Sequence, residues 1–105
     1  MRMWNVNAKK MCRNHLLGEH VETHMFAGCI KKKKSLKGYV DTGLVEVHNL
    51  KKRHDVLAKE MKIRGMNHKS PIQFFKAYKA GKVDIKKSKK DLINRCLECK
   101  VNFNK

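Results

Sequence analysis

The chain has 105 residues, of which 41% are hydrophobic and 33% are charged, and this size fits one domain over 1–105 while excluding a membrane span of about 20 apolar residues. Its N-terminus lacks the long apolar stretch of a signal peptide, so we expect a cytoplasmic protein, nucleoid-associated or nuclear depending on its source. A net charge of +17, from 26 Lys and Arg against nine Asp and Glu, favours nucleic acid over a membrane surface as the partner, because no helix combines a free apolar face with its lysines.

A long first helix is predicted from Ala8 to about Ala27, because this stretch contains no proline and only one glycine. Asn7 is a suitable N-cap, since its side chain can accept a hydrogen bond from the first turn. Residues 28–49 form a loop-rich middle segment, in which 39–40 and 44–47 are predicted to be short extended pieces.

Residues 49–64 are predicted to form an amphipathic helix that ends at Gly65. Its apolar face is spaced at i, i+4, i+7 and i+11, and consists of Leu50, His54, Leu57 and Met61. Lysines, among them Lys51 and Lys52, occupy the opposite face. This pattern is typical of a helix that packs one side against a core and exposes the other side to solvent or to a polyanion.

Two more helices are predicted towards the C-terminus. Ser70 and Pro71 are typical of an N-cap and a first helical position, and Gly81 of a helix end; the helix between them would carry Phe74, Phe75 and Tyr78. Asp84 can cap a last helix whose apolar stripe is Ile85, Leu92, Cys96 and Leu97. The elements together predict an all-α fold, a small single-domain bundle of three to four helices with a loop-rich middle segment.

The chain has four cysteines, Cys12, Cys29, Cys96 and Cys99. A reducing intracellular compartment disfavours disulfides between them. Cys96 and Cys99 form a C-x-x-C pair that could supply two zinc ligands, but no second pair of this kind is present, so buried thiols on a helix are the favoured interpretation. We therefore expect no metal and no cofactor.

One face of the first helix carries an unusual group of polar side chains at helical spacing, namely Cys12, His15, Glu19 and Glu22, followed by Phe26. Acidic residues are scarce in this chain, and two of them lie one turn apart here although like charges repel. Two alternatives remain open for this face. It could be a solvated surface paired with lysines, or a metal site that takes further ligands from another element.

Chain lengths suggest a more specific arrangement. An extended segment from Met1 to Ala8 spans at most ~23 Å, and the helix rises ~21 Å from Ala8 to Glu22, so a segment folded back along the helix can bring Met1 beside Glu22. An α-amino group ordinarily has a pKa near ~8, against ~10.4 for lysine, so more of it is free base at neutral pH. A free amine beside a carboxylate suits attack on a sugar carbon followed by Schiff-base formation.

Three motifs, in this order and spacing, resemble the pyrimidine-dimer DNA glycosylase/AP lyase family, of which a bacteriophage repair enzyme is typical, and particularly its short cellular members. The motifs are Met1-Arg2-Met3-Trp4, His15-Leu16-Leu17-Gly18-Glu19-His20-Val21-Glu22 and Arg64-Gly65-Met66-Asn67-His68-Lys69-Ser70-Pro71. The resemblance implies that an N-terminal amine attacks C1′ of the lesion nucleotide, and that Glu22 assists imine formation and β-elimination. It also matches Arg2 and His15 to an arginine and a histidine of the family's site.

The chain departs from the phage enzyme in ways that concern the nucleophile and lesion recognition. Bulky Arg2 should block removal of Met1, so Met1 itself is the expected nucleophile. Val21 and Met25 replace two arginines that flank the phage glutamate, and the aromatic and basic C-terminal segment of that enzyme is missing. His24, the run of four lysines and the aromatic cluster Phe74, Phe75 and Tyr78 are candidates to compensate, although helical spacing favours a core position for the aromatics.

We therefore predict a DNA glycosylase with AP lyase activity on pyrimidine dimers. The expected catalytic residues are Met1, Glu22, His15 and Glu19. The expected DNA-binding residues are Arg2, Arg13, His24, Lys31, Lys32, Lys33, Lys34, Lys51, Lys52, Arg64 and Lys69. The expected partner is double-stranded DNA with damaged bases, bound by a monomer without an obligate protein partner or a membrane. The alternatives are a glycosylase/lyase for another damaged or modified base and a non-enzymatic basic nucleic-acid-binding protein.

Overall fold

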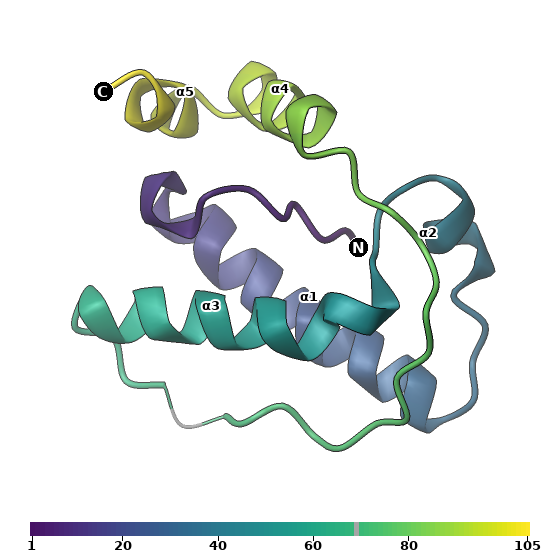
Figure 1. Cartoon of the computed structure of the whole chain (residues 1–105). Helices are drawn as coiled ribbons and strands as arrows, with labels where there is room; N and C mark the ends of the chain where they lie inside the picture. Colours follow the sequence, from purple (N-terminus) through teal and green to yellow (C-terminus); the bar gives the residue numbers. More distant parts are fainter. Residues whose placement is uncertain (69) are drawn as a thin grey trace.

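Two helices, α1 (Arg13–Lys31) and α3 (Leu50–Ile63), cross at the centre of the molecule (Figure 1). This computed structural model describes residues 1–68 and 70–105, and within them the remaining helices are α2 (Lys37–Asp41), α4 (Ile85–Arg95) and α5 (Leu97–Phe103). Short 3₁₀ turns span Ala8–Lys10 and Val47–Asn49. The all-α prediction is confirmed, and the described residues form one globule with no strand and with more, shorter helices than the three to four expected.

The first helix begins later than predicted. Asn7 does act as a cap, but it accepts from the Lys9 N–H of the 3₁₀ turn Ala8–Lys10 rather than opening α1. The long helix starts only after Cys12, whose sulfur accepts a hydrogen bond from the His15 N–H. The physical reason is packing, because the turn lets Ala8 and the neighbouring Met11 enter the core before the helix axis begins.

Helix α3 confirms its predicted pattern. All four residues of the apolar face are buried, with exposed fractions of 6% or less, and they are Leu50, His54, Leu57 and Met61. Gly65 follows the helix with a φ of +81°, the left-handed conformation that ends helices and that glycine adopts without strain. The sequence periodicity was therefore sufficient to place both the helix and its buried side.

The predicted helix from Ser70 to Gly81 is wrong. Residues 70–84 are irregular and run past α1 and α3 to the start of α4 (Figure 1). The backbone of this segment bonds to the middle of the chain instead of to itself, as in the Val47 N–H donating to the Ala80 carbonyl at 3.0 Å. Gly81 has a φ of +86°, and a Cβ there would lie 2.0 Å from the Val45 carbonyl oxygen, so this glycine permits a close approach of two chain segments.

Because this helix is absent, the aromatic residues Phe74, Phe75 and Tyr78 do not lie together. Phe75 packs against the core, whereas Phe74 is 89% exposed and Tyr78 is 46% exposed. The expectation of a shared core position was therefore wrong for Phe74 and Tyr78, because without a helix the three rings no longer share one face. The predicted extended piece at 39–40 is also wrong, since these residues lie in α2.

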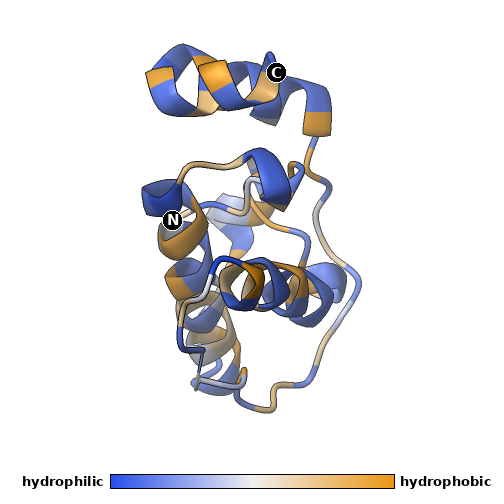
Figure 2. Cartoon of the chain, turned by 90° about the vertical axis from the view of Figure 1, so that its left-hand side faces the viewer, coloured by the Kyte–Doolittle hydropathy of each residue, from blue (hydrophilic) through white to orange (hydrophobic). Residues whose placement is uncertain are grey.

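Helices α4 and α5 form a separate layer over the N-terminal segment (Figures 1 and 2). Asp84 caps α4 as predicted, accepting from the Lys87 N–H. The predicted apolar stripe is only partly right, because Leu92 is fully buried while Ile85 is 52% and Leu97 is 76% exposed. An extended Cys96, at φ −128° and ψ 112°, breaks the stripe by separating the two helices.

Two hydrophobic clusters make up the core. The first joins the start of α1 to the end of α3 and to α4–α5, and includes Trp4, Leu16, Leu57, Leu92 and Cys99. The second lies around the end of α1 and includes Met3, Phe26, Leu36, Val45, Val47 and Leu50. Met3 and Trp4 thus enter different clusters, which fixes the N-terminal segment between the layers. No helix in the described part of the chain is long and apolar enough to cross a membrane.

Candidate active site

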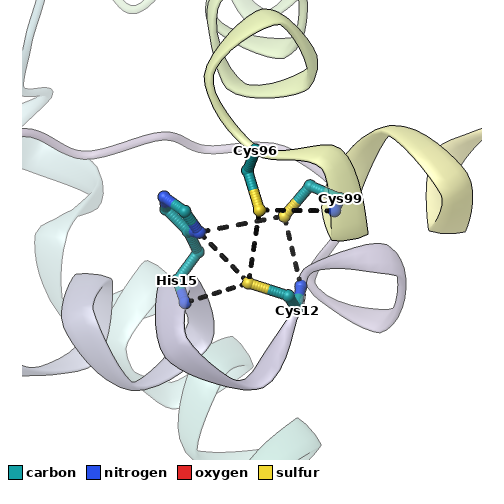
Figure 3. Close-up of side chains that lie close together, drawn as sticks. All are labelled: Cys12, His15, Cys96 and Cys99. Atoms are coloured by element: carbon teal, nitrogen blue, oxygen red, sulfur yellow. Dashed lines mark hydrogen bonds between the residues drawn. The ribbon is translucent and has the colours of Figure 1, made fainter.

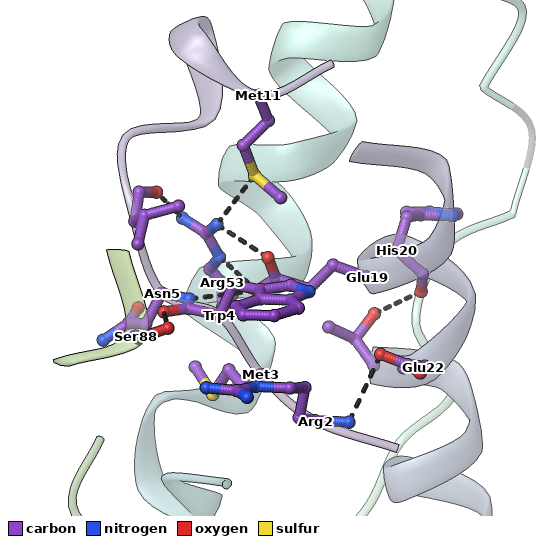
Figure 4. Close-up of polar contacts among 12 residues, drawn as sticks. Arg2, Met3, Trp4, Asn5, Met11, Glu19, His20, Glu22, Arg53 and Ser88 are labelled. Carbon is purple, nitrogen blue, oxygen red and sulfur yellow. Dashed lines mark hydrogen bonds and ion pairs between the residues drawn. The ribbon is translucent and has the colours of Figure 1, made fainter. Parts of the chain in front are cut away.

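The first six residues lie between α1 and α4 and are held by both (Figures 1 and 4). The Ser88 hydroxyl of α4 donates to the Trp4 carbonyl at 2.6 Å. Three backbone N–H groups of the segment donate elsewhere: Arg2 to Glu22 at 3.3 Å, Met3 to the Leu44 carbonyl at 2.7 Å, and Asn5 to Glu19 at 3.4 Å. The segment therefore folds back along α1, as the chain lengths allowed.

Glu22 of α1 lies next to the first two residues of this segment. Its Oε2 accepts the N–H of Arg2 at 3.3 Å. Because the backbone nitrogens of adjacent residues are at most about 3.7 Å apart, the Met1 amine lies within about 7 Å of the same oxygen. The fold therefore brings two of the predicted catalytic groups, the Met1 amine and the Glu22 carboxylate, near each other.

A pocket of about 200 Å³, here called the Glu22 pocket, opens beside this carboxylate. Its walls come from the N-terminal segment, from one face of α1 and from the end of α4, and are Arg2, Trp4, Asn14, His15, Gly18, Glu19, Glu22 and Arg95. The pocket is thus lined by all three predicted catalytic side chains of α1, which are His15, Glu19 and Glu22. Its other walls are two arginines, the indole ring of Trp4, Asn14 and Gly18.

Arg2 is fixed above Trp4 with an unused donor. Its guanidinium carbon lies 3.8 Å from the centre of the Trp4 ring, and an Nη is 3.7 Å from Asp91 of α4. Its buried Nε has no hydrogen-bond partner among residues 1–68 and 70–105. Burial lowers the pKa of Arg2 and Asp91 partly offsets this effect, so the side chain stays a cation at neutral pH. Arg2 also borders a second cavity of about 350 Å³, with Lys82 and Lys87.

Glu19 is held in a buried ion pair rather than facing a free space. Arg53 of α3 donates to its two oxygens at 2.6 and 2.9 Å, and the side chains are 6% and 0% exposed. A further Arg53 nitrogen donates to the Val6 carbonyl at 2.7 Å (Figure 4). Glu19 therefore joins α1, α3 and the N-terminal segment, and both of its oxygens are engaged by Arg53 rather than free to act as metal ligands with Cys12 and His15.

His15 lines the same pocket from the other end. Its ring lies edge to face with Trp4, with centroids 5.9 Å apart. Its Nδ1 is 3.1 Å from the Cys12 sulfur. The cysteine that caps α1 therefore contacts the Nδ1 side of the His15 ring, and Nε2 lies on the other side of the ring (Figure 3).

Comparison with known proteins identifies the family of this site. A model of the pyrimidine dimer DNA glycosylase family matches residues 1–74, which is 74 of the 105 residues. The chain belongs to this family. No curated protein and no solved structure matches it. The match covers the N-terminal segment, α1 and α3, and it therefore includes every wall of the Glu22 pocket except Arg95.

The predicted DNA-binding residues of this glycosylase family member fall into four groups. Seven are exposed and available, namely Arg13, Lys31, Lys32, Lys33, Lys34, Lys51 and Lys52. Arg64 is engaged within the protein, since its Nη2 donates to the carbonyls of Ala8, Lys9 and Met11 at 2.8–3.2 Å. Lys69 lies outside the described residues. Arg2 and His24 are partly buried, Arg2 in the pocket and His24 among other histidines.

Four histidines gather between α1 and α3 in this family member, and their rings lie 4.8–5.3 Å apart. They are His20, His24, His54 and His68. His20 Nε2 is 2.9 Å from His68 Nε2, and His54 is bonded to Asp55 and to the Ser70 carbonyl. Burial, followed by the nearby His54, His24 and His68, lowers the pKa of His20 from 6.5 to about 4.

This shift predicts acid sensitivity. An unfolded chain protonates His20 below about pH 6.5 while the folded chain does not until about pH 4, so stability is complete above pH 6.5 and falls as the pH drops towards 4. We expect a loss of about 2 kcal/mol between pH 7 and pH 5 from this residue, measured by urea unfolding. His20→Gln should flatten the dependence and exposed His48→Gln should not; equal profiles for both variants would contradict the assignment.

Sequence reasoning missed four residues that shape the site, namely Trp4, Arg53, Asp91 and Arg95. Arg53 had a usable signal, because it lies three residues after Leu50 and four before Leu57 and so shares their buried face. Asp91 and Arg95 had none, since they belong to an exposed-looking lysine-rich helix that packs over the N-terminal segment only in the folded chain.

Proposed function

We propose that this protein excises a base of a pyrimidine dimer in duplex DNA and then cleaves the strand, with the α-amine of Met1 as nucleophile. The supporting observation is the hydrogen bond from the Arg2 N–H to Glu22, which keeps the first residue within about 7 Å of a carboxylate in a pocket lined by arginines. Membership of the glycosylase family gives the substrate class. The strand-cleavage step and its imine intermediate go beyond what the family description covers, and we propose them from the arrangement of the site.

The reaction begins when the neutral amine attacks C1′ of the lesion nucleotide. The C1′–N glycosidic bond breaks and its electron pair leaves with the base, while the amine nitrogen loses its protons and forms an imine with the ring-opened sugar. Loss of a C2′ proton then expels the 3′ phosphate and breaks the strand, and water finally releases the amine. Glu22 stabilises the positive charge that develops at the sugar and accepts and returns the protons.

Access to C1′ requires the DNA to deform. A glycosidic carbon inside a stacked duplex is out of reach, so a nucleotide must be displaced at a cost of a few kcal/mol. Arg2 and Arg95 both line the Glu22 pocket, and their guanidinium groups would hold the phosphates that flank the displaced nucleotide. Fixed phosphates keep the sugar in line with the amine.

Exposed lysines supply the remaining affinity. The four consecutive lysines that start at Lys31, together with Arg13, Lys51 and Lys52, are free to meet phosphates. Because each neutralised phosphate releases counterions, binding to any duplex should weaken steeply as salt rises. Lesion choice then depends on the pocket, while these side chains give affinity without sequence preference.

Borohydride trapping tests the proposal directly. The protein is incubated with UV-irradiated or abasic duplex and sodium borohydride, which reduces an imine to a stable amine, and the adduct is mapped by peptide mass spectrometry. We expect the DNA to be attached to the N-terminal peptide. Selective acetylation of the α-amine should abolish both adduct and cleavage.

Two results would overturn this function. Cleavage that survives N-terminal acetylation would show that another group is the nucleophile. Binding without any nicking of dimer-containing or abasic duplex would reduce the protein to a basic nucleic-acid binder. A panel of oxidised and alkylated bases, run beside the dimer, distinguishes a different lesion specificity from a failure of the chemistry.

A further inference from the structure

A second cluster of reactive side chains lies at the edge of the site, and of its members only His15 also lines the Glu22 pocket. Cys12 and His15 come from the start of α1, and Cys96 and Cys99 from the junction of α4 and α5 (Figure 3). Their four potential ligand atoms all lie within 4.8 Å of one another. We propose that these side chains bind one structural zinc ion.

The distances fit a tetrahedral ion. With Zn–S near 2.3 Å and Zn–N near 2.05 Å, ideal tetrahedral ligands are about 3.8 Å apart for two sulfurs and about 3.6 Å for sulfur and nitrogen. The Cys12 and Cys96 sulfurs are 3.8 Å apart. His15 Nδ1 lies 3.1 Å from the Cys12 sulfur and 4.0 Å from the Cys99 sulfur. The remaining pairs of ligand atoms lie within 4.8 Å of one another, so shifts of up to about 1 Å would complete the geometry.

Backbone donors already surround the sulfurs. The Cys12 sulfur accepts the His15 N–H at 3.4 Å, the Cys96 sulfur accepts the Cys99 N–H at 3.4 Å, and the Cys99 sulfur accepts the Cys12 N–H at 3.3 Å. Each of the three sulfurs thus has one N–H directed at it. Such donors stabilise the thiolates that zinc requires, and they orient ligands in the manner of a metal site's outer shell.

The donor set selects zinc over the alternatives. Three sulfurs and one imidazole form a closed site with no position for water, which is typical of structural zinc. A disulfide between Cys12 and Cys96 would need the sulfurs to approach from 3.8 Å to about 2.05 Å, and it would leave the other two donors unused. Zinc binding displaces the thiol protons, which pass to solvent.

Such an ion would connect parts of the chain that are far apart in sequence. It would hold α5 against the start of α1, across a separation of 84 residues between Cys12 and Cys96. It would also engage His15 Nδ1, leaving the other ring nitrogen to carry a proton as a donor. Because His15 also lines the Glu22 pocket, zinc would fix one wall of the active site.

Metal analysis of the full-length protein tests this inference without reference to activity. We expect one zinc per chain by mass spectrometry, and a Tm lowered by more than about 10 °C after removal of the metal by a chelator. Cys96→Ser should lose the zinc. Cys29→Ser is the matched control, because Cys29 lies outside the cluster, and it should keep one zinc per chain.

A second measurement covers the case in which Cys96→Ser fails to fold. Cobalt(II) added to the metal-free wild-type protein should give the thiolate charge-transfer and ligand-field bands of a tetrahedral site, and zinc should displace them. The proposal is overturned if the wild-type protein holds no zinc and cobalt produces no such bands. It is equally overturned if Cys96→Ser retains stoichiometric zinc, or if reduced, zinc-supplied protein contains a Cys12–Cys96 disulfide.

Discussion

Glu22→Gln is expected to lower the rate of strand cleavage by about 10²–10⁴-fold, the usual contribution of a general acid or base. Glutamine has the same shape and keeps an oxygen that can accept the Arg2 N–H, now bonded to Glu22 at 3.3 Å. The N-terminal segment should therefore stay in place while the carboxylate that we propose moves protons is lost. Single-turnover cleavage of an abasic duplex measures the effect on chemistry.

The control for this variant is Glu98→Gln, which makes the same chemical change on the exposed surface of α5. It should cleave at the wild-type rate. Duplex affinity, measured in parallel at fixed salt, should be unchanged or slightly higher for both variants, because each removes one negative charge from a protein that binds a polyanion. Wild-type cleavage by Glu22→Gln would remove the carboxylate from the mechanism.

Arg53→Met is expected to lower the free energy of unfolding by about 3–5 kcal/mol, the cost of leaving one member of a buried ion pair alone. The methionine fills much of the arginine volume but donates no hydrogen bonds. Glu19, whose side chain is fully buried, would keep its charge without a partner, and the Val6 carbonyl would lose its donor. Urea unfolding followed by circular dichroism measures the change.

Two variants make this second prediction specific. Lys37→Met breaks the exposed ion pair with Asp41 in α2, whose side chains are 81% and 54% exposed, and should change stability by less than about 0.5 kcal/mol. Glu19→Leu added to Arg53→Met removes the orphaned charge and should recover part of the loss. A double variant that is less stable than Arg53→Met alone would show that the unpaired Glu19 charge does not cause the loss of stability.

Local patterns predicted the helices whose stability comes from one continuous face. Leu50 and Leu57 repeat on the buried side of α3, and that periodicity is a property of the local sequence. Pro71 and Gly81 predicted a helix between them just as clearly. The residues between them form an irregular segment that buries only one side, and the Ala80 carbonyl accepts a hydrogen bond from the Val47 N–H rather than one within a helix. Tertiary hydrogen bonds overrode local propensity there.

The site was predictable to the extent that it lies on one helix. Helical spacing placed His15, Glu19 and Glu22 on one side, and chain length allowed the fold-back of the N-terminus. The partners from other elements were not predictable, because nothing in one sequence shows that Asp91 meets Arg2. The cluster that we propose binds zinc was predictable only in part. The Cys96-x-x-Cys99 pair was noted, but its counterpart, Cys12-x-x-His15, ends in histidine and was missed by a search for a second cysteine pair.

The placement of Trp4 against Ser88, 84 residues later in the chain, has a consequence during biosynthesis. The N-terminal segment is synthesised before α4, and it reaches its final environment only when α4 is complete and can cover it. A nascent chain that lacks α4 has no Arg95, and it therefore lacks one wall of the Glu22 pocket.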